Sequence, residues 1–330
     1  MPFNRLFLVA AACAAPLSIA ACGSSDSDAP IIPEGTHHGY VVNSVLIPTT
    51  PAQVTQFGLD LGSKTSTKLD GNPDNVLGSL LNALASPAIK FDIQGPLTDA
   101  VKQGSLLLLV DFQTKDFITA AASGLSVKFG ATPMPAPCNA PGDCGHHLEG
   151  SGTFTIAADS PTDDALAGKI VSGSFNGGPG ELALQIAIGS TTPVSLSLLH
   201  ARVQATGISE TGIMSANVGG LVTQTELNTK LGPAIQGQVA TIIDRDCKGA
   251  RTPPGCGCTV GSTGAQVIAL LEGVPTAIAD CSITVEEIFG YPVIMPMLAP
   301  DSCSKDTCKT ADSLSIGVRV TAVKATFPMM

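Results

Sequence analysis

Residues 69–78 carry oxygen-bearing side chains at a spacing that could bind a metal ion. Asp70, Asn72 and Asp74 occupy the first, third and fifth positions of a calcium-loop pattern that runs into an apolar helix. Carboxylate and amide oxygens at that spacing can converge on one Ca²⁺ ion. The twelfth position is Leu81, which supplies no carboxylate, so the pattern predicts at most a weak calcium site. The alternative is a turn rich in Asp and Asn that caps the following helix.

The same stretch and the C-terminal segment carry a resemblance to a known group of proteins. Residues 60–61 with 69–78, and the tail 312–323, resemble the Asp-rich stretch and the C-terminal end of uncharacterised myxobacterial-type surface lipoproteins. In that group a second Asp-rich loop often precedes the tail. Here the segment between Cys303 and Cys308 stands in its place. The resemblance implies a lipid-anchored surface protein and no particular activity.

The N-terminal residues predict export and a lipid anchor. One positive charge and a short apolar stretch form the pattern of a signal peptide over residues 1–21, too short and Ala-rich for a membrane-spanning helix. The sequence Ile-Ala-Ala-Cys at 19–22 looks like a lipobox, in which Cys22 would be diacylated, although an ordinary signal cleaved elsewhere is the alternative. Residues 22–38 are then the lipidated Cys and a flexible tether. Because Gly23 is not Asp, similarity to known lipoproteins favours the outer membrane.

The cysteines indicate an oxidising compartment. Of ten, Cys13 leaves with the signal and Cys22 takes lipid, so eight remain, an even number typical of four disulfides in an exported chain. Short spacing predicts the local pairs Cys138–Cys144 and Cys303–Cys308. The remaining four have three possible connectivities, with zinc as the rival interpretation. These four are Cys247, Cys256, Cys258 and Cys281.

Histidines occur as two adjacent pairs that could contribute to a transition-metal site. His37 and His38 lie at the end of the tether, and His146 and His147 follow Cys144, near Asp143 and Glu149. Solvated loop histidines are the competing interpretation, and the one we expect. His200 is expected to be a hydrogen-bonded residue of a strand rather than a catalyst.

Motifs for catalysis are scarce. The chain contains no G-x-S-x-G, no H-E-x-x-H and no P-loop. A formal G-x-G-x-x-A at 178–183 contains Pro179 and is followed by a strand pattern, which is incompatible with a dinucleotide-binding helix. No catalytic residue is therefore assigned.

The secondary structure that must position the candidate site residues is predicted to be mainly β. Alternating or continuous apolar runs predict strands at 40–47, 106–110, 125–129, 153–156, 182–188, 194–198 and 314–327. Helical periodicity predicts a helix from Val76, capped by Asp74 or Asn75, and further helices near 234–243, after Thr263 and after Thr284. We expect a mainly β (α+β) fold, a β-sandwich in one domain over 39–330, with a helical, disulfide-bonded section at 223–312.

Composition and charge argue against some classes of binding partner. The net charge is −10 with 13% charged residues, which argues against a nucleic-acid partner, and the absence of Trp leaves little stacking surface for sugars or bases. The sequence predicts a protein anchored to the cell envelope by lipid, of binding or structural type, whose partner is an envelope protein or ligand. An exported hydrolase with a site assembled from distant residues is the alternative, and Ca²⁺ is the one cofactor suggested.

Overall fold

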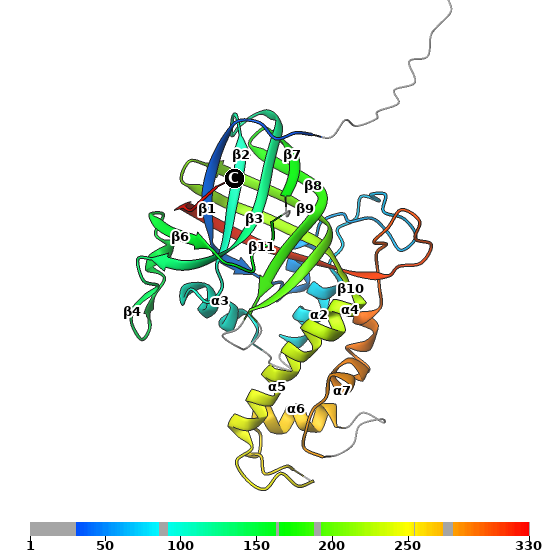
Figure 1. The fold of residues 1–330 in the computed structure, drawn as a ribbon. Coiled ribbons are helices and arrows are strands. Elements are labelled where there is room, and N and C mark those ends of the chain that lie inside the picture. Colours follow the sequence, from blue (N-terminus) through cyan, green and yellow to red (C-terminus); the bar gives the residue numbers. More distant parts are fainter. Residues whose placement is uncertain are drawn as a thin grey trace, which may run out of the picture. The chain divides into compact units, whose positions relative to one another are not determined.

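The computed structural model describes residues 31–85, 92–162, 165–187, 193–253, 255–272 and 280–329. Within those ranges eight antiparallel strands close into a barrel, and β6 (Gly152–Ile156) lies outside it, between β3 and the end of β11 (Figure 1). The barrel strands, in spatial order, are β1 (Thr36–Leu46), β2 (Leu108–Thr114), β3 (Ala120–Met134), β7 (Ala165–Val171), β8 (Ser174–Ile186), β9 (Val194–Ser209), β10 (Gly212–Thr223) and β11 (Ser313–Thr326). The expected signal peptide, Cys22 and the first part of the tether lie outside the described residues.

The expected mainly β fold is confirmed, but the expected sandwich is wrong. β11 pairs with both β10 and β1, with Val41 opposite Val323 and Val45 opposite Val320, so the first and last strands join and the sheet closes. Register shifts, such as the one between Ile213 and Ala216, bend strands in the way a barrel requires. Sandwich and barrel strands share the same alternation because each buries one face, so the pattern alone does not separate them.

Apolar side chains fill the barrel interior. Phe112 and Phe175 are fully buried and meet edge to face with their ring centroids 5.0 Å apart. The remaining cavity has a volume of about 40 Å³, and every side chain that lines it is apolar, Leu108 and Leu198 among them. An eight-stranded barrel is just wide enough for side chains to fill it. The interior is therefore a packed core.

The continuous apolar run at 106–110 is buried on both faces, as expected. Leu108 points into the barrel, whereas Leu107 and Leu109 belong to a second cluster outside it. Phe154 from β6 and Phe327 beyond β11 cover that outer cluster. The extra strand β6 thus shields apolar surface that a bare barrel would expose.

Helices occupy two long connections of the barrel. The β1–β2 connection holds α1 (Pro51–Phe57), α2 (Val76–Leu84) and α3 (Gln94–Lys102), and the β10–β11 connection holds α4 (Gln224–Glu226), α5 (Gly232–Asp246), α6 (Thr263–Leu271) and α7 (Val285–Gly290). The predicted helix after Thr284 is α7, which begins with a capping box formed by Thr284 and Glu287. The cap of α6 is Ser262 rather than Thr263, because the Ser262 hydroxyl accepts the Ala265 N–H. No helix of the described residues is both long and apolar enough to cross a membrane.

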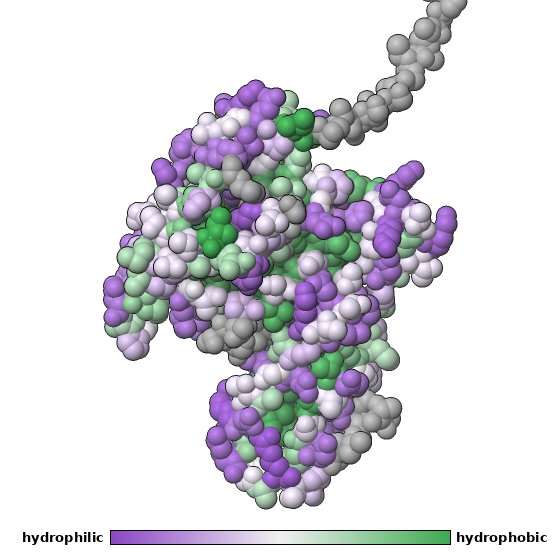
Figure 2. All heavy atoms as spheres, viewed as in Figure 1, coloured by the Kyte–Doolittle hydropathy of each residue, from purple (hydrophilic) through white to green (hydrophobic). Residues whose placement is uncertain are grey.

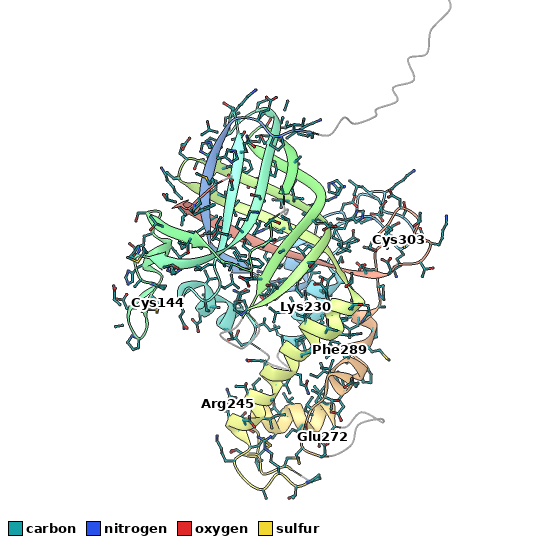
Figure 3. All side chains as sticks on the ribbon, in the orientation of Figure 1. Cys144, Lys230, Arg245, Glu272, Phe289 and Cys303 are labelled. Atoms are coloured by element: carbon teal, nitrogen blue, oxygen red, sulfur yellow. A yellow bond between two sulfur atoms is a disulfide. The ribbon has the colours of Figure 1, made fainter. Side chains whose placement is uncertain are left out.

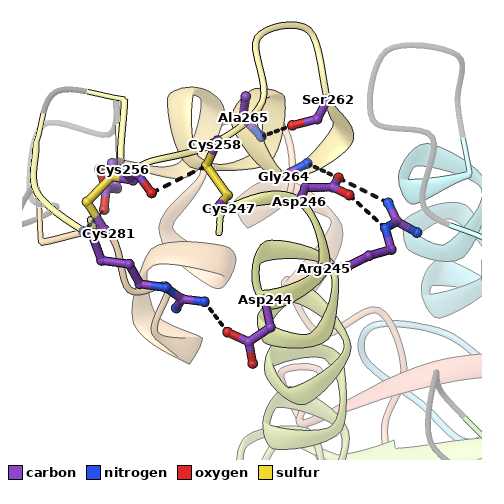
Figure 4. The surroundings of a disulfide bond; sticks show 12 residues. Asp244, Arg245, Asp246, Cys247, Cys256, Cys258, Ser262, Gly264, Ala265 and Cys281 are labelled. Atoms are coloured by element: carbon purple, nitrogen blue, oxygen red, sulfur yellow. Dashed lines mark hydrogen bonds and ion pairs between the residues drawn. A yellow bond between two sulfur atoms is a disulfide. The ribbon is translucent and has the colours of Figure 1, made fainter. Parts of the chain in front are cut away.

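The eight cysteines of the described residues form four disulfides. The local pairs Cys138–Cys144 and Cys303–Cys308 are confirmed (Figure 3). The other two are Cys247–Cys258 and Cys256–Cys281, which tie the end of α5 to the segments around α6 (Figure 4). A zinc site would need free thiolates, so the paired sulfurs remove that alternative.

Candidate functional site

The Asp-rich loop, which we define as residues 59–75 between α1 and α2, is held against β11 by one buried amide. The Asn75 Oδ1 atom accepts the N–H of Gly78 at 3.0 Å and the N–H of Gly317 at 2.8 Å. Its Nδ2 donates to the carbonyls of Val54 and Gly317, each at 3.1 Å. Asn75 is therefore both the expected cap of α2 and the residue that joins the loop to the barrel.

An acidic residue, Asp301, joins the same junction from the segment before β11. The Asp301 carboxylate accepts the backbone N–H and the hydroxyl of Ser315, and that hydroxyl accepts the N–H of Val76 at 2.9 Å. Burial raises the pKa of Asp301, although the hydrogen bonds from Ser315 oppose the shift. The start of α2 and the start of β11 are thus connected through one hydroxyl.

The three predicted calcium ligands lie in the Asp-rich loop, where they organise the backbone. The Asp70 Oδ1 atom accepts the backbone and side-chain N–H groups of Asn72, at 2.9 and 3.1 Å. Asp74 accepts the N–H of Leu61 at 2.8 Å. Asp60, which the spacing argument did not single out, accepts the N–H of Gly71 at 2.7 Å. These contacts fit the interpretation as a turn that caps a helix.

The ligand atoms of these carboxylates do not converge. Among the described residues, three or more His, Cys, Asp or Glu ligand atoms come within 4.8 Å of one another only at Cys256, Glu272 and Cys281, and there the two sulfurs are bonded to each other. A calcium ion at the Asp-rich loop would therefore require the loop to rearrange. Calcium binding stays a prediction.

Among the carboxyl groups of the Asp-rich loop, that of Asp74 has the most strongly shifted pKa. Burial raises its pKa to about 6, with smaller contributions from the negative charges of Asp301, Asp70 and Asp60, while the hydrogen bond from Leu61 opposes the shift. The loop thus collects negative charge around a half-buried carboxyl group. At neutral pH the carboxyl group is still ionised, and its charge then destabilises the fold.

We expect the substitution Asp74→Asn to stabilise the fold at neutral pH and not at pH 4. Between pH 4 and 6 the folded carboxyl keeps a proton that the unfolded chain has lost, so wild-type stability falls as pH rises through this window. Asparagine keeps an acceptor for the Leu61 N–H and does not titrate. Thermal unfolding from pH 4 to 7.5 should show a Tm difference that grows to a few degrees. A difference independent of pH would contradict this assignment.

A polar groove of about 450 Å³ separates the Asp-rich loop from the outer face of β8 and β9. The loop side includes Leu59, Asp60 and Gly71, and the barrel side includes Arg202 and Gln204. Burial lowers the pKa of Arg202 while the charge of Asp60 raises it, and the guanidinium remains charged. This groove brings together three segments that are distant in sequence, and the sequence offered no signal for it.

The first histidine pair lies in β1 rather than in a solvated tether, which corrects the expectation for both residues. The His37 Nδ1 atom lies 2.8 Å from the carboxylate of Asp111, which is almost fully buried. The ring of His38 packs on Phe117, and its Nδ1 lies 3.4 Å from Glu210. Both are tied to barrel residues by the pairing of β1 with its neighbours.

The second pair divides into one exposed and one buried imidazole. His146 lies within 3.0 Å of Asp143 and 3.3 Å of Glu149, as an exposed cluster. His147 is fully buried, so the expectation of a solvated loop is wrong for it, and burial lowers its pKa. Among the described residues its ring makes no hydrogen bond. His200 bonds through Nε2 to the Ser304 carbonyl at 2.9 Å, as expected for a hydrogen-bonded strand residue.

Within the described residues no histidine lies within hydrogen-bond reach of a Ser, Thr or Cys side chain. A histidine that activates Ser, Thr or Cys must lie within hydrogen-bond reach of that side chain. Within the described ranges, the imidazoles of His37, His38, His146 and His200 contact carboxylates, an amide or a backbone carbonyl instead, and that of His147 has no hydrogen-bond partner. No protein-family model, curated protein or solved structure matches the chain.

Proposed function

We propose that this chain is a lipid-anchored protein of the bacterial cell envelope that acts by binding a partner rather than by catalysis. The observation that supports this most is the barrel interior, which is filled by apolar side chains and leaves only about 40 Å³. The side chains able to recognise a partner lie outside the barrel, on the Asp-rich loop and along the adjacent groove. Binding at an outer surface is favoured over the alternative, an exported hydrolase, because no histidine of the described residues lies within hydrogen-bond reach of a Ser, Thr or Cys side chain.

The four disulfides support the exported part of this proposal. Disulfides persist in oxidising compartments and are rare in the cytosol. The lipobox-like sequence before Cys22 and the resemblance to surface lipoproteins point the same way. The partner we propose is an envelope protein or ligand on the outer-membrane side, and not a nucleic acid, given the net charge of −10.

The barrel end at which the described chain begins has features that suit a membrane-proximal position. Exposed apolar side chains gather at this end: Ile32 is 74% exposed, Ile118 64% and Val171 61%. The N–H of Gly173 bonds to the Ile118 carbonyl, so the β2–β3 and β7–β8 turns lie side by side. In contrast, the face shown in Figure 2 is largely hydrophilic or intermediate, with small separate apolar areas.

Weak calcium binding at the Asp-rich loop is a further part of the proposal. Negative charge gathers around Asp74, but only two of the three predicted side chains are carboxylates and no bidentate Glu is present. Such a set suits the weak extracellular range of affinity, with a Kd of about 10⁻⁴–10⁻³ M. The Asp74→Asn melts, repeated with millimolar calcium and with chelator, test this: calcium should raise the wild-type Tm alone.

The anchor is tested by the substitution Cys22→Ala. We expect the wild-type protein to enter the detergent phase in a phase-separation assay and the variant to enter the aqueous phase almost completely, since no acyl chains can be attached. Cys13→Ala is a matched control, because Cys13 would leave with the signal peptide, and its partition should equal that of the wild type. Unchanged partition of Cys22→Ala would contradict the anchor.

A further inference from the structure

Three polar side chains form a donor array on the outer face of β8 and β9. Asn176 pairs directly with Gln204 across the two strands. Arg202 lies two residues before Gln204, and residues two apart on a strand point to the same face of the sheet. Directly opposite residues have Cβ atoms about 5 Å apart, so the two amides and the guanidinium can contact one small ligand. All three side chains line the groove defined above.

Among the described residues the guanidinium of Arg202 has no hydrogen-bond or ion-pair partner, unlike those of the other arginines there. Of the four arginines in the described ranges, Arg245 pairs with Asp246 and Arg251 with Asp244. Arg319 bonds to Asn217 and to the Gln56 carbonyl. Arg202 is half-buried and has no hydrogen bond or ion pair with the described residues. Although the charge of Asp60 acts on it, no carboxylate oxygen of those residues lies within 4.0 Å of its nitrogens.

The two side-chain amides beside Arg202 also lack hydrogen-bond partners within the described part of the protein. Among the described residues neither the Asn176 nor the Gln204 side chain makes a hydrogen bond, and both are exposed at the groove. An amide NH₂ and a guanidinium together offer several N–H donors that are free for a ligand. The array therefore has donor capacity that the protein itself does not use.

The Asp-rich loop and a glycine shape the groove around this array. Leu59 lies against Gly219, the β10 residue paired with Arg202, so the Asp-rich loop stands beside the array as a wall. Gly178 has a φ of +98°, and a Cβ added there would lie 2.3 Å from the Ala201 carbonyl oxygen. Glycine is therefore required at this point of the floor.

We propose that this groove binds an oxyanion, a carboxylate or a phosphate, through Arg202 with Asn176 and Gln204 as additional donors. A guanidinium presents paired N–H groups that match the two oxygens of such an anion. The neighbouring carboxylate of Asp60 disfavours multiply charged anions and favours a ligand whose single negative charge is accompanied by a neutral or cationic group. This inference rests on the proposed binding role and names its ligand class.

The test is isothermal titration of the detergent-solubilised full-length protein with N-acetylglycine, dimethyl phosphate and the neutral N-acetylglycine amide. We expect one or both oxyanions to bind and the amide not to bind, and the preferred oxyanion distinguishes a carboxylate source from a phosphate source. Arg202→Gln should weaken binding at least tenfold. Arg251→Gln is the matched control, since it removes the same charge from an arginine outside the groove, and its affinity should be unchanged.

A second variant separates loss of the site from loss of the fold. Gln204→Glu changes an exposed residue and adds a negative charge beside Arg202, so it should also abolish oxyanion binding while the Tm stays close to that of the wild type. Equal binding of the neutral amide, no binding of either oxyanion, or unchanged binding by Arg202→Gln would each overturn the inference. The proposed anchor would be unaffected by those results, because the partition of Cys22→Ala decides it independently.

Discussion

Replacing Asn75 with alanine is expected to destabilise the fold by about 3 kcal/mol, because each buried group left without a hydrogen bond costs about 1–3 kcal/mol. The side chain of Asn75 is 6% exposed and serves four backbone groups, those of Gly78, Val54 and both peptide groups of Gly317. Alanine would leave all four unpaired and uncap α2. Chemical or thermal denaturation should detect the change, with a fall in Tm on the order of 6 °C.

The neighbouring Asn72 provides the control. It lies in the same loop and is exposed, and its side chain bonds to Asp70 alone among the residues that the structure describes. Asn72→Ala should therefore change the free energy of unfolding by less than about 0.5 kcal/mol. If the two alanine variants had the same stability, Asn75 would not be the residue that joins the Asp-rich loop to the barrel.

Removal of the Cys256–Cys281 disulfide, as the double variant Cys256→Ser with Cys281→Ser, should have an effect of similar size. The bond joins residues 25 apart, and the loop-closure model assigns about 3.5 kcal/mol to a loop of that length. The helices it secures, α5 to α7, contribute apolar residues such as Ile243, Val267 and Ile288 to the core. We expect these helices to lose protection from hydrogen exchange before the barrel strands do.

The local disulfide Cys138–Cys144 is the matched comparison. It spans six residues, for which the same model gives about 2 kcal/mol, and it closes the small hairpin of β4 (Cys138–Ala140) and β5 (Asp143–Cys144). The corresponding double serine variant should be less destabilised and should keep the helical section protected. An equal loss of protection in both variants would show that loop length does not govern their effects.

Recognition on the outside of a filled barrel is consistent with how this chain distributes its polar residues. The side chains around the interior cavity are all apolar, whereas Arg202 and the carboxylates of the Asp-rich loop lie on the outer face and the connections. The loops at the surface can then vary in charge without disturbing the core. Substitutions in the groove should therefore change binding without changing stability, whereas the substitution of Asn75 should change stability.

The sequence by itself determined the local features. Apolar alternation predicted most strands, the cap at Asn75 and the helical period predicted α2, and short spacing predicted Cys138–Cys144 and Cys303–Cys308. Each depends on residues close together in the chain, where backbone geometry dictates which side chains meet. The helices α1 and α3 were not predicted because few of their positions are apolar.

Only the tertiary structure decided what depends on distant pairing. Barrel closure requires β1 to meet β11, and no local pattern distinguishes that pairing from two packed sheets. The crossed disulfides of the helical section depend on how α5 and α6 pack. The groove at Arg202 likewise needs the Asp-rich loop to lie beside β8 and β9. Contacts of this kind depend on the three-dimensional course of the whole chain, which no local spacing of residues encodes.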